Sequence, residues 1–136
     1  MNIPTREYII DSNRLLIFES GGEFTEPDNL IFPEKLDWVL DAIQYPIFDT
    51  EIYPSILEKA AILSWKINQG HVFYDGNKRT STFMLQIFLR SNGFDLDISD
   101  EEFVELALNV ATSQDTKYSF ESYVDYLSSR LIIFRG

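Results

Sequence analysis

The chain has 136 residues, of which 45% are hydrophobic and 15% aromatic, and its formal net charge is −11 at pH 7. This length and apolar content predict one folded domain, residues 1–136, rather than a disordered chain. The absence of cysteine excludes disulfides and thiolate metal sites, and the acidic charge argues against a nucleic-acid partner. No apolar run reaches the roughly 20 residues that span a bilayer, and the first residues lack the features of a signal peptide. We therefore expect a cytoplasmic protein with no membrane segment.

The first thirty residues give the weakest signal. Residues 11–13, Asp-Ser-Asn, favour a helix cap, and the helix would run to Glu19 before the glycine pair 21–22. The apolar run 15–18 is equally typical of a short buried strand, although we favour the helix. The glycine, proline, aspartate and asparagine content of residues 21–29 predicts a loop.

The next segment predicts a helix followed by a break in the pattern. Pro33 suits the first helical position, and the apolar residues at 36, 39, 40 and 43 form one face. From Tyr45 to Tyr53 the period is lost, and this stretch predicts either a plain connection or a small hairpin, which we call the flap.

Four further helices follow from apolar spacing and caps. One begins at Pro54 and ends near Gly70, and a very apolar one covers residues 80–91 and ends at Gly93. A capping box at residues 99–102 begins another, and Ser119 caps the last. The sequence therefore predicts a compact all-α single domain, a helical bundle with a small flap before the central helix pair.

Between the two central helices lies the polar segment H-V-F-Y-D-G-N-K-R-T, residues 71–80. His71 is the only histidine, and its ordinary pKa suits a proton acceptor near neutral pH. Asp75 is an oxygen ligand of the kind that Mg²⁺ prefers. Lys78 and Arg79 stand at a helix start, where unpaired N–H groups and the helix dipole favour an anion such as phosphate. Together these groups indicate phosphoryl or nucleotidyl transfer.

Each of these residues also has a purely structural interpretation. His71 alone is more often a hydrogen-bonded structural histidine, and Asp75 or Asn77 could simply cap the helix. Gly76 could provide a backbone turn closed to other residues, or room for phosphate. The two cations resist such an explanation, because positive charge opposes the dipole at a helix start unless an anion joins it.

The pattern H-x-F-x-D-G-N-K-R-T closely resembles the signature of the Fic/Doc family, and specifically its death-on-curing (Doc) branch. The resemblance extends to residues 53–61 and 89–93, and it covers the central half to two-thirds of the chain. It implies that His71 is the catalytic base, that Asp75 binds Mg²⁺, and that ATP is held by a phosphate-binding set, Gly76, Asn77, Lys78 and Arg79. It also implies that a flap beside the active site holds the target polypeptide, here through Tyr45, Ile47, Asp49, Thr50 and Ile52.

Lys78 distinguishes the two branches of the family. Relatives that transfer AMP typically have glycine at this position and a second arginine where this chain has Thr82. A lysine there is similar to Doc-like proteins, which present the γ-phosphate to a protein hydroxyl, and whose best-known target is elongation factor Tu. We therefore expect a toxin with kinase chemistry, with AMP transfer as the nearest alternative and a non-catalytic helical interaction module as a more distant one. Because no inhibitory [ST]-x-x-x-E-[GN] helix is present, we expect inhibition by a small antitoxin in trans.

Overall fold

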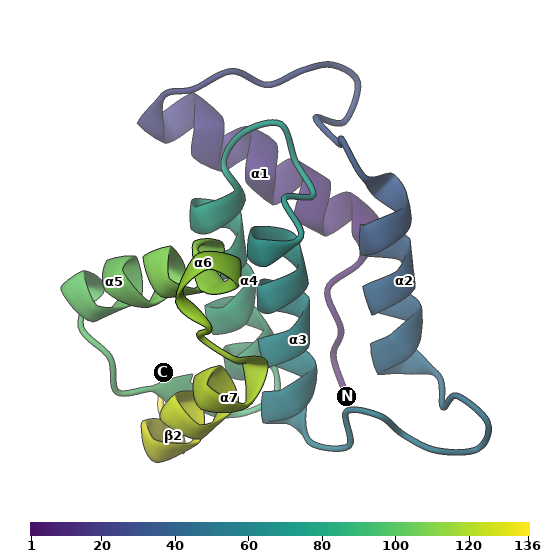
Figure 1. Cartoon of the computed structure of the whole chain (residues 1–136), viewed down its shortest axis with the longest axis vertical. Coiled ribbons are helices and arrows are strands. Elements are labelled where there is room, and N and C mark those ends of the chain that lie inside the picture. Colours follow the sequence, from purple (N-terminus) through teal and green to yellow (C-terminus); the bar gives the residue numbers. More distant parts are fainter.

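The computed structural model describes all 136 residues and contains seven helices and one pair of short strands. In chain order these are α1 (Arg6–Ser20), α2 (Pro33–Gln44), α3 (Ile56–Gln69), α4 (Asn77–Ser91), β1 (Phe94–Leu96), α5 (Asp100–Ala111), α6 (Ser113–Thr116), α7 (Phe120–Ser129) and β2 (Leu131–Ile133). Figure 1 shows α3 and α4 side by side at the centre, α1 across one end, α2 on one flank, and α5 to α7 on the other. The mostly helical fold is confirmed, and the strand pair is an addition to it.

The two central helices α3 and α4 together contribute 10 of the 25 residues of the buried core. Leu63 and Ile67 of α3 and Met84 and Phe88 of α4 are fully buried, as is Phe73 in the loop that joins the two helices. One continuous buried cluster includes residues of every helix except the short α6. The loop between α3 and α4 is therefore anchored to the best-packed part of the protein. None of the helices has the length and apolar composition needed to cross a membrane.

Hydroxyl side chains cap the starts of four helices, at Thr5, Ser55, Ser99 and Ser119. Each hydroxyl accepts a hydrogen bond from the backbone N–H three residues further on, which satisfies one of the free donors at a helix start. The predicted caps at Ser99 and Ser119 are confirmed. The helix expected from Pro54 starts two residues later, because Ser55 is its cap.

The helix predicted in the first thirty residues is confirmed, but its start is wrong. Thr5 caps α1, so residues 11–13 lie inside the helix rather than at its beginning. The strand alternative for residues 15–18 is excluded, because α1 continues to Ser20 and ends at Gly21 with φ +89°. The loop predicted after α1 and the helix start at Pro33 are both confirmed.

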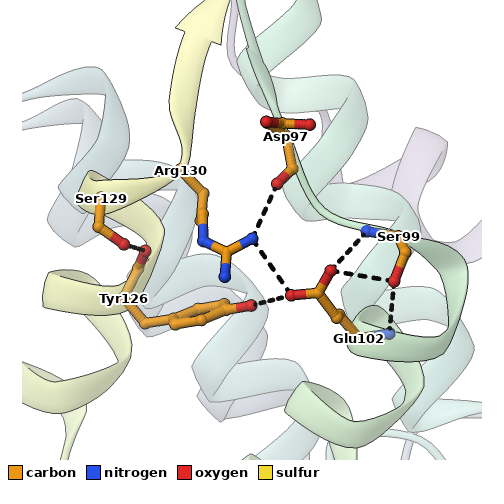
Figure 2. Close-up of polar contacts among 6 residues, drawn as sticks. All are labelled: Asp97, Ser99, Glu102, Tyr126, Ser129 and Arg130. Carbon is orange, nitrogen blue, oxygen red and sulfur yellow. Dashed lines mark hydrogen bonds and ion pairs between the residues drawn. The ribbon is translucent and has the colours of Figure 1, made fainter.

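The C-terminal end is closed by the strand pair and a polar network. β1 and β2 pair antiparallel, with Phe94 opposite Ile133. Figure 2 shows Arg130, just before β2, donating to the Asp97 carbonyl and forming an ion pair of 3.2 Å with Glu102. The Tyr126 hydroxyl donates to Glu102 at 2.8 Å, and this bond is the main cause that holds the pKa of Glu102 below its usual value. The network joins the start of α5 to the end of α7.

Candidate active site

The backbone changes direction at His71, directly after α3. Gly70, predicted as the residue that ends the helix, remains right-handed with φ −72°, and His71 adopts the left-handed conformation with φ +51°. Glycine usually takes that position at a helix end, and a side chain there is uncommon. Surrounding structure must therefore hold His71 in this conformation, as is frequent at functional sites.

The loop of residues 70–76, which we call the motif loop, is fixed from the side of α2. Lys35 of α2 donates from Nζ to the Gly70 carbonyl at 2.8 Å. The N–H groups of Ile31 and Phe32 both donate to the carbonyl of Val72, at 2.8 and 3.2 Å. These bonds hold the carbonyls on both sides of His71, so its backbone has little freedom to relax.

Asn77, the first residue of α4, closes the motif loop. Its Oδ1 accepts the N–H of Phe73 at 2.9 Å, and its Nδ2 donates to the Phe73 carbonyl at 2.8 Å. The same Nδ2 lies 3.3 Å from Nδ1 of the His71 ring. The Asn77 side chain is buried, and its polar atoms are bonded within the motif loop. Its position therefore suits it to orient His71, and it does not cap α4.

Asp75 and Gly76 form the turn into α4. One carboxylate oxygen of Asp75 accepts the N–H of Glu23 at 3.0 Å, and the other accepts the N–H of Gly76 at 2.8 Å. The Glu23 bond is the largest of the causes that lower the pKa of Asp75, to which the nearby cations add. Gly76 has φ +81°, and a Cβ there would come within 2.8 Å of the Asn13 amide nitrogen. Of the two interpretations of Gly76, the structure supports the backbone turn closed to other residues.

The start of α4 is electrically unusual. No side chain caps it, and its first turn has no acidic residue but two cations, Lys78 and Arg79. None of the five ion pairs in the structure includes either of them. Uncapped N–H groups, the positive end of the helix dipole and two unpaired cations all favour an anion at this place.

Five of the six residues predicted for catalysis, metal binding and phosphate binding surround one pocket of about 260 Å³, which we call the motif pocket. Its lining consists of Asn68, Gln69, His71, Tyr74, Asp75, Gly76, Asn77, Lys78 and Ala111. Arg79 lies outside this pocket and instead lines a larger, mainly apolar groove of about 810 Å³ between α1, α4 and α5. Lys78 lines both cavities.

The residues of the pocket fit a magnesium nucleotide. Mg²⁺ commonly uses only one or two protein carboxylates, with waters and substrate phosphates as its other ligands. Asp75 is the one carboxylate of the motif pocket; a carboxyl group is ionised at neutral pH, and the lowered pKa of Asp75 favours that form further. No group of three or more acidic or histidine side chains lies close enough together to form a cage made of protein alone.

The flap is a small hairpin but does not lie at this site. Ile47 and Thr50 exchange backbone hydrogen bonds of 2.9 and 3.0 Å around a turn at Phe48 and Asp49, which both have positive φ. The hairpin joins the end of α2 to the start of α3, whereas His71 follows the end of α3 (Figure 1). The 14 residues of α3 correspond to about 21 Å.

The structure therefore separates all five predicted flap residues from His71, and the expected position beside the active site is not observed. One segment that does lie against the motif loop is residues 29–32, where Leu30 forms a β-bridge with Phe73. No local pattern predicts this contact, because the loop before α2 has no strand pattern of its own.

Sequence reasoning also missed the buried amides under the motif loop. Asn13 and Asn29 are both fully buried, and both donate to the carbonyl of Asp75, at 3.0 and 3.2 Å. One signal was available: Asn13 lies four residues from both Ile9 and Ile17 on the buried face of α1. A lone amide on an apolar helix face predicts a buried polar partner.

Comparison with known proteins matches this part of the chain. The model of the Fic/DOC family matches residues 3–89, which include α1 to α3, the motif loop and most of α4. The Toxin Doc of Mycolicibacterium smegmatis is 32% identical over 78 residues, an alignment that covers 53% of this chain. The same alignment covers 60% of that toxin.

Proposed function

The chain belongs to the Fic/DOC family, and from this premise we propose that it is a Doc-like toxin that transfers the γ-phosphate of ATP to a hydroxyl group of a protein. The observation that carries the proposal is the motif pocket, in which an exposed histidine, an ionised carboxylate and an uncapped helix start with an unpaired lysine lie together. No other residue set in the chain combines a base, a hard oxygen ligand and an anion site.

Each residue has a role that follows from its position. His71, held by the loop backbone and the Asn77 amide, accepts the proton of the incoming hydroxyl. The N–H groups at the start of α4 and the Lys78 ammonium bind phosphate oxygens, and Arg79 adds positive charge from the adjoining groove. Asp75 would hold Mg²⁺, which neutralises phosphate charge when it is bound.

Lys78 supports γ-phosphate transfer over AMP transfer. Its side chain lines the motif pocket and occupies a part of the anion site that a glycine would leave open. A nucleotide bound there presents its terminal phosphate toward His71. The acceptor would be a hydroxyl of a translation factor such as elongation factor Tu in the cytoplasm.

Labelled ATP tests this assignment directly. The purified protein is incubated with cell lysate and Mg²⁺, with the label on either the α- or the γ-phosphate, and the labelled protein is identified by mass spectrometry. We expect γ-label on one main band and none with the His71→Asn variant. Label from the α-phosphate alone would establish AMP transfer, and label from neither would contradict both activities.

We also propose that the apolar groove binds the helix of an antitoxin. Leu16, Phe83 and Phe103 lie along it, and Val104, at 72% exposure, leaves a large apolar surface uncovered. An amphipathic helix is the common occupant of such a groove. The absence of an internal inhibitory helix is consistent with a partner in trans.

Growth assays test the groove. Expression of the chain alone should arrest growth, and the partner gene should restore it. Val104→Glu places a charge on an exposed position, so it should remain toxic but escape the antitoxin. The matched control is Glu121→Ala on α7, outside the groove, which should remain neutralised. Harmless expression of a folded, ATP-binding protein would contradict the toxin assignment.

A further inference from the structure

Two asparagines from distant parts of the chain meet beneath the turn into α4. Asn13 belongs to α1 and Asn29 to the loop before α2, and neither side chain is exposed to solvent. Nδ2 of Asn29 donates to Oδ1 of Asn13 at 2.9 Å. Both amides also donate to one acceptor, the carbonyl oxygen of Asp75.

The remaining polar atoms of the two amides are paired as well. Asn13 donates its second N–H to Oγ1 of Thr80, in the first turn of α4, at 2.9 Å. Oδ1 of Asn29 accepts the N–H of Thr25 at 2.8 Å, and the backbone carbonyl of Asn29 accepts the N–H of Tyr74 at 2.9 Å. No buried side-chain nitrogen or oxygen in the protein lacks a partner.

Packing alone does not explain amides at this place. The other buried positions on this face of α1 are mainly isoleucine, at 9, 10 and 17. Burying a polar group is unfavourable unless all its hydrogen bonds are made, and an apolar side chain of similar size avoids that requirement. Unlike apolar side chains, the amides make directional hydrogen bonds, and a fully paired network permits only one orientation of the Asp75–Gly76 peptide.

That peptide controls the geometry of the anion site. Its N–H, on Gly76, donates to the Asp75 carboxylate, and Gly76 is the cap residue from which α4 starts. The Asn13 amide also occupies the space that a Cβ on Gly76 would need. A rotation of this peptide would therefore move both the carboxylate and the first free N–H groups of α4.

We propose that Asn13 and Asn29 are positioning residues of the active site, which fix the Asp75–Gly76 peptide through its carbonyl oxygen so that carboxylate and helix start face the same phosphate group. This inference rests on the proposed phosphotransfer function. Neither asparagine lines the motif pocket, so both act through the residues that they contact, chiefly Asp75.

A matched pair of substitutions tests the proposal. Asn13→Asp keeps the shape of the side chain and its acceptor for Asn29, but it replaces the two N–H donors with an oxygen that faces the Asp75 carbonyl. Asn92→Asp makes the same chemical change at the opposite end of α4, where Nδ2 donates to the carbonyls of Asn2 and Phe88 at 2.7 and 2.8 Å.

Three quantities are measured on the full-length proteins: the midpoint of thermal unfolding, kcat and KM for transfer from γ-labelled ATP, and the ¹H–¹⁵N shifts of Gly76, Asn77 and Lys78. We expect Asn13→Asp to lower kcat by about tenfold or more, because a small displacement of reacting groups has effects of that size. The KM for the protein target should change little. Asn92→Asp should destabilise the fold without moving kcat or the three amide signals.

Several outcomes would overturn the positioning role. A folded Asn13→Asp variant with wild-type kcat and unchanged amide signals would do so, and so would an equal loss of kcat in Asn92→Asp. If Asn13→Asp does not fold, Thr80→Val removes only the acceptor that aligns Asn13, and the same two readouts apply to it. If the wild-type protein transfers no phosphate, the proposed function fails, but the amide signals still decide whether Asn13 orients the turn.

Discussion

The two ends of α4 are both tied to the N-terminal part of the chain through asparagine, but in opposite ways. At its start, Asn13 and Asn29 are buried and bind one loop carbonyl. At its end, Asn92 exchanges hydrogen bonds of 2.7 and 2.8 Å with the exposed backbone of Asn2. The 15 residues of α4 put these two ties about 22 Å apart.

The difference shows what each end must do. Exposed groups lose little when a hydrogen bond breaks, because water replaces the partner, so the tie at Asn92 contributes modest stability. Buried amides leave an unsatisfied group when they shift, so the tie at Asn13 enforces one geometry. Buried, directional hydrogen bonds thus fix the geometry of the motif end of α4, and the opposite end can tolerate changes in its hydrogen bonds.

The largest effect is expected at the motif end of α4, where a substitution of His71 should abolish most of the transfer activity. His71→Asn removes the proposed base and keeps a residue type that tolerates positive φ. Transfer should fall by about 10²–10⁴-fold, the usual contribution of a general base. Kinetics with γ-labelled ATP give the rate, and calorimetric titration with MgATP should show that binding is retained. A rate near that of the wild type would remove His71 from the mechanism.

The second prediction compares the two glycines with positive φ that flank α4. In Gly93→Ala the new Cβ has no atom within 4 Å, so only the left-handed backbone is unfavourable. The free energy of unfolding should fall by about 1–2 kcal/mol. In Gly76→Ala the new Cβ would also lie 2.8 Å from the Asn13 amide nitrogen. The free energy of unfolding should fall by about 2–4 kcal/mol, because overpacking adds to the backbone effect.

Urea unfolding of both glycine variants measures these free energies. Since the backbone effect is shared, the difference between the two reports how tightly the turn packs on Asn13. Equal losses would mean that the motif end is no more constrained than the other end.

The third prediction concerns pH. The pKa of Asp75 is lower in the folded protein than its usual value, so this group stabilises the fold above about pH 4 and loses that contribution as the pH falls through the folded-state pKa. Asp75→Asn should therefore be less stable than the wild type at pH 6, and the gap should narrow toward pH 2.5. Thermal unfolding across this range measures it, and a gap independent of pH would contradict the assigned cause.

The smallest effect is expected at the exposed tie. Asn2→Ala removes the side-chain bond to the Ser91 carbonyl and leaves the backbone bonds to Asn92 in place. The change in unfolding free energy should be below about 0.5 kcal/mol, as for most surface substitutions. Transfer activity should be unaffected. A loss of activity here would show that the far end of α4 communicates with the motif pocket.

Local signals predicted most of the helices. The capping box at Ser99, the cap at Ser119 and the proline at 33 each act within one helical turn, and all three were correct. The start of α1 was misplaced because residues 11–13 have cap chemistry but are inside a helix already begun at Thr5. The strands β1 and β2 were not predicted, because each has only three residues, too few to show an alternating apolar pattern.

The site was predictable where one short segment holds it. Residues 71–79 bring histidine, carboxylate and lysine to the same pocket because a single loop and helix start carry them. Lys35 and Asn29 were missed because their partners lie 35 and 46 residues away along the chain. The flap was placed wrongly for a related reason: its position in the fold depends on the direction of α3, which the local pattern does not give.

Lys78 lines both the motif pocket and the apolar groove, so the two proposed occupants, ATP and an antitoxin helix, would share one side chain. Whatever factor a helix in the groove imposes on ATP affinity, ATP must impose on the affinity of that helix, by thermodynamic reciprocity. The strength of neutralisation would then vary with the nucleotide supply of the cell, so one ammonium group could report energy status to the inhibitor.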